Sequence, residues 1–395
     1  MKSVVVYVSI VLLGCAAILA QNTGRNSGQT NGKRVRPSET TQQAAGTPGT
    51  ANSTRAAVEK GATWLASVQG ADGGWGQDGG DSSNIRQHQS LESQGNDVAN
   101  TALAALALLR AGKQYRPNVE RAVDFILKRV EASPADGLAI TDVKQTQVQR
   151  KLGPYIDTFV ASMLLAHVDG TFAKAGNTRV RSGLEKCVAK IQKNQTRDGS
   201  WNIAGGWAPI LGTSLASRSL YEASKKGVPV NRDVLARADA YTVQNQKSGG
   251  SMSPGSGVGS GSITGSVVVL DRTASTSAGV SLYQDAQALE QLSRTPESRR
   301  KNAEEISAIG RKLSDSKFVE GYGSIGGEEF FSYLNIGDGL KRSGGKEWRE
   351  WHAKITEKIL KLQNNDGTWA GHHCITGRCA VTSAAILNLT NDYAN

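Results

Sequence analysis

A seven-residue phrase, Gln-x-x-Asp-Gly-x-Trp, occurs three times in this chain of 395 residues. The copies end at Trp75, Trp201 and Trp369, and each lies between two runs with helical character. A phrase that recurs in the same local setting is the signature of a repeat architecture, in which one small unit stacks on the next. The repeat therefore constrains the possible folds more than any other feature of the sequence.

Two kinds of helical run alternate along the chain around these copies. The first kind has apolar residues at intervals of three and four, which predicts a helix with one buried face. These amphipathic runs are 58–68, 119–130, 180–191, 234–243, 303–313 and 351–362. The second kind is small or apolar on most sides, which predicts a buried helix. These apolar runs are 98–110, 158–167, 213–224, 277–292, 330–341 and 380–390.

Six outer and six inner helices in alternation predict an all-α fold, an (α/α)6 toroid of six helical hairpins over residues 56–395. An open solenoid is the alternative, but its terminal repeats need polar caps, and the run 380–390 is too apolar to be one. Within the phrase, Asp and Gly suit a tight turn. We expect the Trp to pack back over the end of the preceding helix and the Gln to bond the terminal carbonyls of that helix, which makes the phrase a structural staple.

The N-terminus predicts export from the cytoplasm. Residues 1–20 combine Lys2 with an apolar stretch, as signal peptides do. Three alternatives stay open: lipid attachment at Cys15, ordinary cleavage after Ala17 or Ala20, and an uncleaved anchor. Residues 21–55 are polar and nearly free of large apolar side chains, which predicts a disordered linker. We therefore expect a periplasmic or cell-envelope protein that meets the membrane only through its N-terminus.

The formal net charge is +11, but the basic residues of the repeat region are spread among acids at helical spacing. Such spacing is typical of solvated helix faces rather than of a nucleic-acid surface. Cys187 occupies a core-facing position of the run 180–191, and we expect it to be buried as a small apolar residue.

In an all-α setting of six hairpins, the repeated phrase resembles the prenyltransferase and squalene-cyclase repeat of terpenoid cyclase-like α/α toroids. That superfamily includes squalene–hopene cyclases, the β-subunits of protein prenyltransferases and the thioester domains of complement-like proteins. The resemblance covers residues 56–395 and implies a fold rather than one activity.

Candidate catalytic residues lie where inner helices begin. Helix N-termini favour negative charge, and in a closed toroid these ends would form one rim. Asp97 and Asp157 begin the runs 98–110 and 158–167, although N-capping alone explains such residues equally well. Glu328 and Glu329 precede the run 330–341. The four carboxylates are our candidates for acid–base chemistry.

A metal site is a second candidate on the same rim. His372, His373 and Cys374 precede the last inner run, next to the hairpin that carries Glu329, and zinc prefers His, Cys and carboxylate ligands. The resemblance to prenyltransferase β-subunits also implies zinc, held there by an Asp-x-Cys pair and a His. No Asp-x-Cys occurs at 326–333, so zinc would use Glu329, His372 and Cys374. The alternative is a polar cluster that closes the last hairpin.

The resemblance leaves three functions open. The first is an exported binding or scaffolding toroid for an apolar small molecule or a protein partner, because the known catalytic signatures are missing. Asp157 stands without the partners of the cyclases' Asp-x-Asp-Asp-Thr-Ala acid, and Gly-Cys-Gly-Glu-Gln is absent. The second is a metal-assisted enzyme of the isoprenoid class, either a cyclase or similar to the prenyltransferases. The third is a glycan-active toroid, a lyase or hydrolase that uses Asp97, Asp157 and Glu329.

Overall fold

The computed structural model describes residues 48–78, 95–201, 203, 209–249, 278–314, 326–372 and 374–393. The chain divides into two units, Met1–Gln43 and Ala44–Asn395, and all described residues belong to the second. The predicted export signal, most of the predicted linker and His373 lie outside the described residues.

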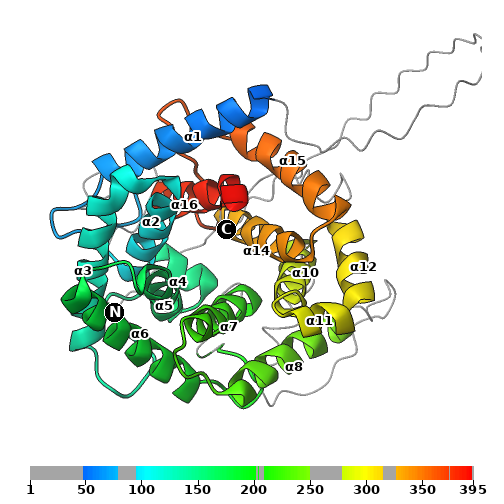
Figure 1. The fold of residues 1–395 in the computed structure, drawn as a ribbon, viewed down its shortest axis with the longest axis horizontal. Helices are drawn as coiled ribbons and strands as arrows, with labels where there is room; N and C mark the ends of the chain where they lie inside the picture. The colour runs from blue at the N-terminus through cyan, green and yellow to red at the C-terminus, as the bar shows by residue number, and fades with distance from the viewer. Residues whose placement is uncertain are drawn as a thin grey trace, which may run out of the picture. The chain divides into compact units, whose positions relative to one another are not determined.

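The second unit consists of two concentric rings of helices (Figure 1). All twelve predicted helices are present, and the predicted all-α toroid is confirmed. The outer helices are α1 (Pro48–Ser67), α3 (Arg116–Ala132), α6 (Lys174–Lys193), α8 (Arg232–Gly249), α12 (Ala303–Ser314) and α15 (Lys346–Lys361). The inner helices are α2 (Val98–Ala111), α5 (Ile156–Val168), α7 (Pro209–Lys225), α10 (Ala278–Leu292), α14 (Gly327–Ser343) and α16 (Arg378–Leu389).

Within the described residues, four short elements were not predicted. They are the 3-10 helices η1 (Lys113–Tyr115) and η2 (Asn391–Tyr393) and the helices α4 (Gln147–Leu152) and α11 (Pro296–Lys301). The first outer helix also begins earlier than predicted. Because α1 starts at Pro48, residues 48–55, which we assigned to the linker, belong to the helical domain.

The inner ring is closed. Neighbouring inner helices contact one another in the order α2, α5, α7, α10, α14 and α16, and α16 contacts α2 again. Small residues allow this close approach: a Cβ on Gly339 of α14 would lie 2.8 Å from the Leu289 side chain of α10. Burial follows the sequence pattern, since every residue of α2 from Val98 to Leu108 is buried.

The repeated phrase is a staple, as predicted. In the first copy, the indole nitrogen of Trp75 donates to the Leu65 carbonyl near the end of α1 at 2.8 Å, and the Trp75 amide donates to Thr101 Oγ1 of α2 at 2.9 Å. Trp201 and Trp369 repeat both contacts. Each tryptophan therefore ties an outer helix to the inner helix that follows it.

The glutamine of the phrase acts differently from our expectation. Gln69 Nε2 donates to the Gly73 carbonyl within the turn and to the Asn118 carbonyl at the start of α3. It thus binds the next outer helix instead of the helix that has just ended. Gln195 makes the same two kinds of contact, to Gly199 and Val234.

No helix in the described ranges is both long and apolar enough to cross a membrane. Cys187 is fully buried in α6, and this burial raises the pKa of its thiol to about 12. The expectation that it behaves as a small apolar residue is thereby confirmed.

Candidate functional site

The N-terminal ends of α2, α5, α14 and α16 gather at one end of the inner ring, which we call the N-terminal pole. Asp157 at the start of α5 accepts a hydrogen bond from the Ala99 amide of α2 at 3.0 Å. The Cys379 thiol of α16 lies 3.8 Å from the Asn100 carbonyl of α2. Since inner helices run in the same direction around the ring, their positive dipole ends meet here and favour carboxylates.

Asp97 and Asp157 lie together at this pole, each only 2% exposed. Asp97 is the N-cap of α2, and its carboxylate accepts hydrogen bonds from the Asn100 amide and from Asn100 Nδ2, both at 2.8 Å. The second oxygen of Asp157 accepts a hydrogen bond from Gln149 Nε2 at 2.7 Å. The sequence singled out both carboxylates, but only the structure brings them to one place.

Burial raises the pKa of Asp97 to about 7, and the neighbouring charge of Asp157 adds to the rise. Burial also raises the pKa of Asp157 to about 6, while the hydrogen bond from Gln149 works against the rise. Two carboxylates this close to each other resist being charged at the same time. The pair therefore holds a proton near neutral pH, which is the condition for a general acid.

A short unpredicted helix contacts this pair. Thr146 and Gln149 form a capping box that starts α4, and Gln149 reaches from it to Asp157. Two residues further, the Lys151 charge acts on the Cys374 thiol. The sequence signal was present, since Thr-x-x-Gln is a capping-box pattern, but six residues carry too little periodicity to reveal a helix.

Glu328 and Cys374 form a second cluster at the pole. The Cys374 thiol hydrogen-bonds the Glu328 carboxylate, and burial together with this carboxylate raises the pKa of the thiol to about 12. Glu329 accepts a hydrogen bond from Tyr333 Oη at 3.2 Å. The structure thus brings the start of α14 and the loop before α16 together, as predicted, and pairs Cys374 with Glu328.

The predicted zinc ligands do not converge. Glu329 is buried whereas His372 is exposed, and the described residues contain no group of three His, Cys, Asp or Glu side chains placed to hold one metal ion. Cys374 also has φ = +60°, a strained conformation for a residue other than glycine. Zinc binding therefore stays a prediction.

A cluster of charges that the sequence analysis overlooked lies toward the other ends of the inner helices. We call it the central charged cluster. Arg218 of α7 pairs with Asp338 of α14, although α10 separates these helices in the ring. Arg110 of α2 acts on Asp338 as well, so these side chains meet across the ring. The cluster comprises Arg110, His167, Arg218, Glu222, Glu290, Arg294, Asp338 and Arg342.

Glu290 is the most enclosed member, with no exposed surface. Arg294 Nε donates to it at 2.9 Å and Arg342 Nη1 at 2.8 Å. Although burial opposes its charge, Arg294 and Arg342 lower the pKa of Glu290 to about 2. The sequence does contain a signal for this cluster, namely charged residues within helical runs that are otherwise apolar. Charged residues are rarely buried unless they are paired, so such residues indicate buried ion pairs.

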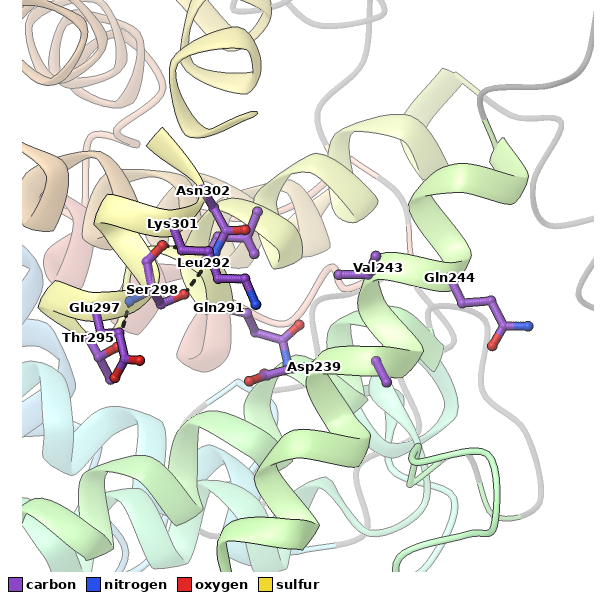
Figure 2. A pocket seen from close by; sticks show the side chains of 11 residues that line it. Asp239, Val243, Gln244, Gln291, Leu292, Thr295, Glu297, Ser298, Lys301 and Asn302 are labelled. Atoms are coloured by element: carbon purple, nitrogen blue, oxygen red, sulfur yellow. Dashed lines mark hydrogen bonds between the residues drawn. The ribbon is translucent and has the colours of Figure 1, made fainter. Parts of the chain in front are cut away.

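A cavity of about 750 Å³ opens between α8, α10 and α11 (Figure 2). Asp239 and Val243 of α8 face Gln291 of α10 across it, and Ser298 and Asn302 form another wall. Gln291 is 4% exposed and its Nε2 bonds Ser217 Oγ at 3.4 Å. No periodic pattern in the sequence indicated this cavity.

Comparisons with known proteins support the resemblance. A family model described as the squalene-hopene cyclase C-terminal domain matches residues 42–138. A squalene–hopene cyclase of Bradyrhizobium diazoefficiens is 39% identical over 70 residues, which are 18% of this chain and 10% of that protein. The alignment thus spans a tenth of the relative's length.

Solved structures of the type II terpene cyclase MstE from Scytonema share the fold. One, in complex with geranylgeranyl dihydroxybenzoate, has a TM-score of 0.53 at 12% identity and covers 87% of this chain and 98% of that chain. The apo structure of another variant has a TM-score of 0.51 at 13% identity and covers 88% and 98%. The repeated phrase, the partial family match and the shared fold thus support the resemblance to squalene-cyclase-like α/α toroids.

Proposed function

We propose that this toroid is an enzyme of the isoprenoid class that donates a proton to an apolar substrate, with the Asp97–Asp157 pair as the acid. The observation that carries the proposal is the buried pair, with pKa values raised to about 7 and about 6. A general acid works best when its pKa lies near the working pH. Asp157 has no further carboxylate beside it in the sequence, but Asp97 is its neighbour in the folded chain.

The substrate class rests on the fold. A structural neighbour is a type II terpene cyclase that binds geranylgeranyl dihydroxybenzoate, and the walls of the present ring are built from apolar inner helices. The glycan-active alternative, with Asp97, Asp157 and Glu329 as its acid–base residues, stays a prediction.

The test is turnover in heavy water. Purified protein is incubated with linear isoprenoids of several lengths, including squalene, and the products are analysed by mass spectrometry. Proton donation predicts one carbon-bound deuterium per product molecule. Asp97→Asn should lower the rate about 10²- to 10⁴-fold, the usual contribution of a general acid, while Asp124→Asn on outer helix α3 should leave the rate unchanged. Deuterium incorporation at the wild-type rate in Asp97→Asn would refute the proposal.

A binding or scaffolding toroid without catalysis is the second candidate. It is favoured by the hydrogen bonds that Asp97 and Asp157 accept at the starts of α2 and α5, since these bonds give both residues a structural role. In this case isoprenoids would bind without conversion. Asp97→Asn would then leave affinity unchanged in an equilibrium binding assay, and no deuterium would appear.

We further propose that the enzyme works outside the cytoplasm, because residues 1–20 have the pattern of an export signal. Cell fractionation with and without residues 1–20 tests export. Incorporation of labelled fatty acid into wild-type protein and its loss in Cys15→Ser would identify lipid attachment, whereas an unlabelled mature protein would point to ordinary cleavage.

A further inference from the structure

α4 lies against the Asp97–Asp157 pair, because its Gln149 donates a hydrogen bond to Asp157. It buries only Val148, Gln149 and Leu152, so one face of this six-residue helix packs on the ring and the rest is more open. A helix this short is not stable without its contacts. Its position therefore depends on its contacts with the rest of the domain.

The first of these is with the loop that leads into α16. Gln147 Nε2 donates to Thr376 Oγ1 at 2.9 Å, and Gln147 Oε1 accepts hydrogen bonds from the Thr376 and Gly377 amides at 2.9 and 3.1 Å. One glutamine thus makes three hydrogen bonds to a segment 229 residues away along the chain. α4 and residues 374–377 are held to each other as one unit.

Both sides of this contact carry backbone strain. Gln145, two residues before Gln147, has φ = +63°, and Cys374, two residues before Thr376, has φ = +60°. These are the two residues other than glycine with positive φ in the described part of the chain. Such conformations are energetically unfavourable and persist only when surrounding contacts hold them. The closed arrangement therefore stores strain at both edges of one hydrogen-bonded contact.

We propose that α4 and residues 374–377 form a movable plug over the N-terminal pole, and that a substrate reaches the Asp97–Asp157 pair when this plug is displaced. The access of substrate to the acid pair rests on the proposed function, whereas the displacement of the plug does not. Displacement moves α4 away from residues 374–377, which breaks the three bonds of Gln147, releases the strain at Gln145 and Cys374, and withdraws Gln149 from Asp157. The plug thereby regulates access to the acid and, through Gln149, the position of its carboxylate.

The chain contains its own reporter of this movement. Cys379 is fully buried in the first turn of α16, directly after the loop that Gln147 holds, and its thiol lies on the Asn100 carbonyl. Cys187 is equally buried, but it lies in the outer helix α6. A thiol reagent can reach either cysteine only when the surrounding structure opens.

The experiment compares the labelling rates of the two cysteines in the folded, substrate-free protein, resolved by peptide mass spectrometry. Three hydrogen bonds hold Gln147, and because each contributes to stability, Gln147→Ala should speed the labelling of Cys379 at least tenfold and leave Cys187 unchanged. The matched control is Gln195→Ala, which removes a glutamine with a similar set of bonds, to Gly199, Val234 and Arg237. This control should not speed the labelling of Cys379 relative to Cys187.

A second variant must act in the opposite direction. Gln145→Gly relieves the strain of the closed state, because glycine adopts positive φ without steric cost, and should slow the labelling of Cys379 severalfold. The proposal is overturned if Gln147→Ala leaves the ratio of Cys379 to Cys187 labelling unchanged, or if Gln145→Gly raises it. Because no substrate is present, this result is independent of the deuterium experiment.

Discussion

Gln363 donates a hydrogen bond from Nε2 to the Ala57 carbonyl at 2.9 Å, across 306 residues of sequence. The last copy of the repeated phrase thereby hydrogen-bonds the first outer helix, just as the earlier copies hydrogen-bond the outer helix that follows them. In the same junction, Gly367 has φ = +88°, and a Cβ there would lie 2.9 Å from Cβ of Lys60. The repeats could in principle stack into an open solenoid. They form a closed ring because the last copy of the phrase hydrogen-bonds the first outer helix, α1.

Removal of a staple should destabilise the whole ring. Trp201 is 4% exposed and bonds the Ile191 carbonyl. Trp201→Ala should lower the free energy of unfolding by roughly 3–5 kcal/mol, as truncation of buried aromatic residues does. Chemical denaturation measures the loss, and Trp64→Ala, at a half-buried position of α1, should cost less. An unchanged melting temperature for Trp201→Ala would contradict the staple role.

The acid pair should make stability depend on pH. Because the pKa of Asp97 is raised to about 7 from about 3.9 in the unfolded chain, the folded state binds the extra proton between these values. Stability should therefore fall by a few kcal/mol as the pH rises from about 4 to 7, and then level off. Urea unfolding across this range measures the slope.

Asp97→Asn should remove most of that slope and still fold. Asn100 Oδ1 is buried without a hydrogen-bond partner among the described atoms, so rotation of the Asn100 amide would let it accept from the side-chain amide that the substitution introduces. A slope that is equally steep in Asp97→Asn would show that Asp97 is not the group that titrates.

The central charged cluster should respond to pH in the opposite sense. The pKa of Glu290 is lowered to about 2 by Arg294 and Arg342, so its contribution is present above about pH 4.5 and is lost as the pH falls toward 2. Glu290→Gln leaves two guanidinium groups without their carboxylate and should cost about 3–5 kcal/mol at neutral pH. Thermal unfolding at pH 7 and pH 3 tests both statements: the difference between wild type and variant should shrink in acid.

Zinc binding can be decided by metal analysis after zinc loading and dialysis. If zinc binds at the N-terminal pole, it should be lost in Cys374→Ser and largely retained in Cys379→Ser, because the Cys379 thiol lies on the Asn100 carbonyl. Less than about a tenth of an equivalent in the wild-type protein would end the zinc prediction, since a site with all its ligands should fill under these conditions.

The order and type of the twelve main helices could be predicted from the sequence because each depends on local periodicity. A run such as 98–110 is apolar on most faces, and such a helix must be buried wherever it lies. The three staples were equally predictable, because Gln, Asp, Gly and Trp occupy fixed positions around one turn. The role of the glutamine was missed, since its partner belongs to the next hairpin.

The sequence by itself thus determined the alternating rings and named Asp97, Asp157, Glu328 and Cys374 as residues of interest. Only the tertiary structure decided that these residues form two pairs, Asp97 with Asp157 and Glu328 with Cys374. The central charged cluster and the contact of Gln147 with Thr376 were also decided at that level. The physical reason is that the pairing of side chains depends on how far each helix is shifted and rotated against its neighbours. Packing across the closed ring sets these shifts and rotations, and the periodicity of the sequence does not record them.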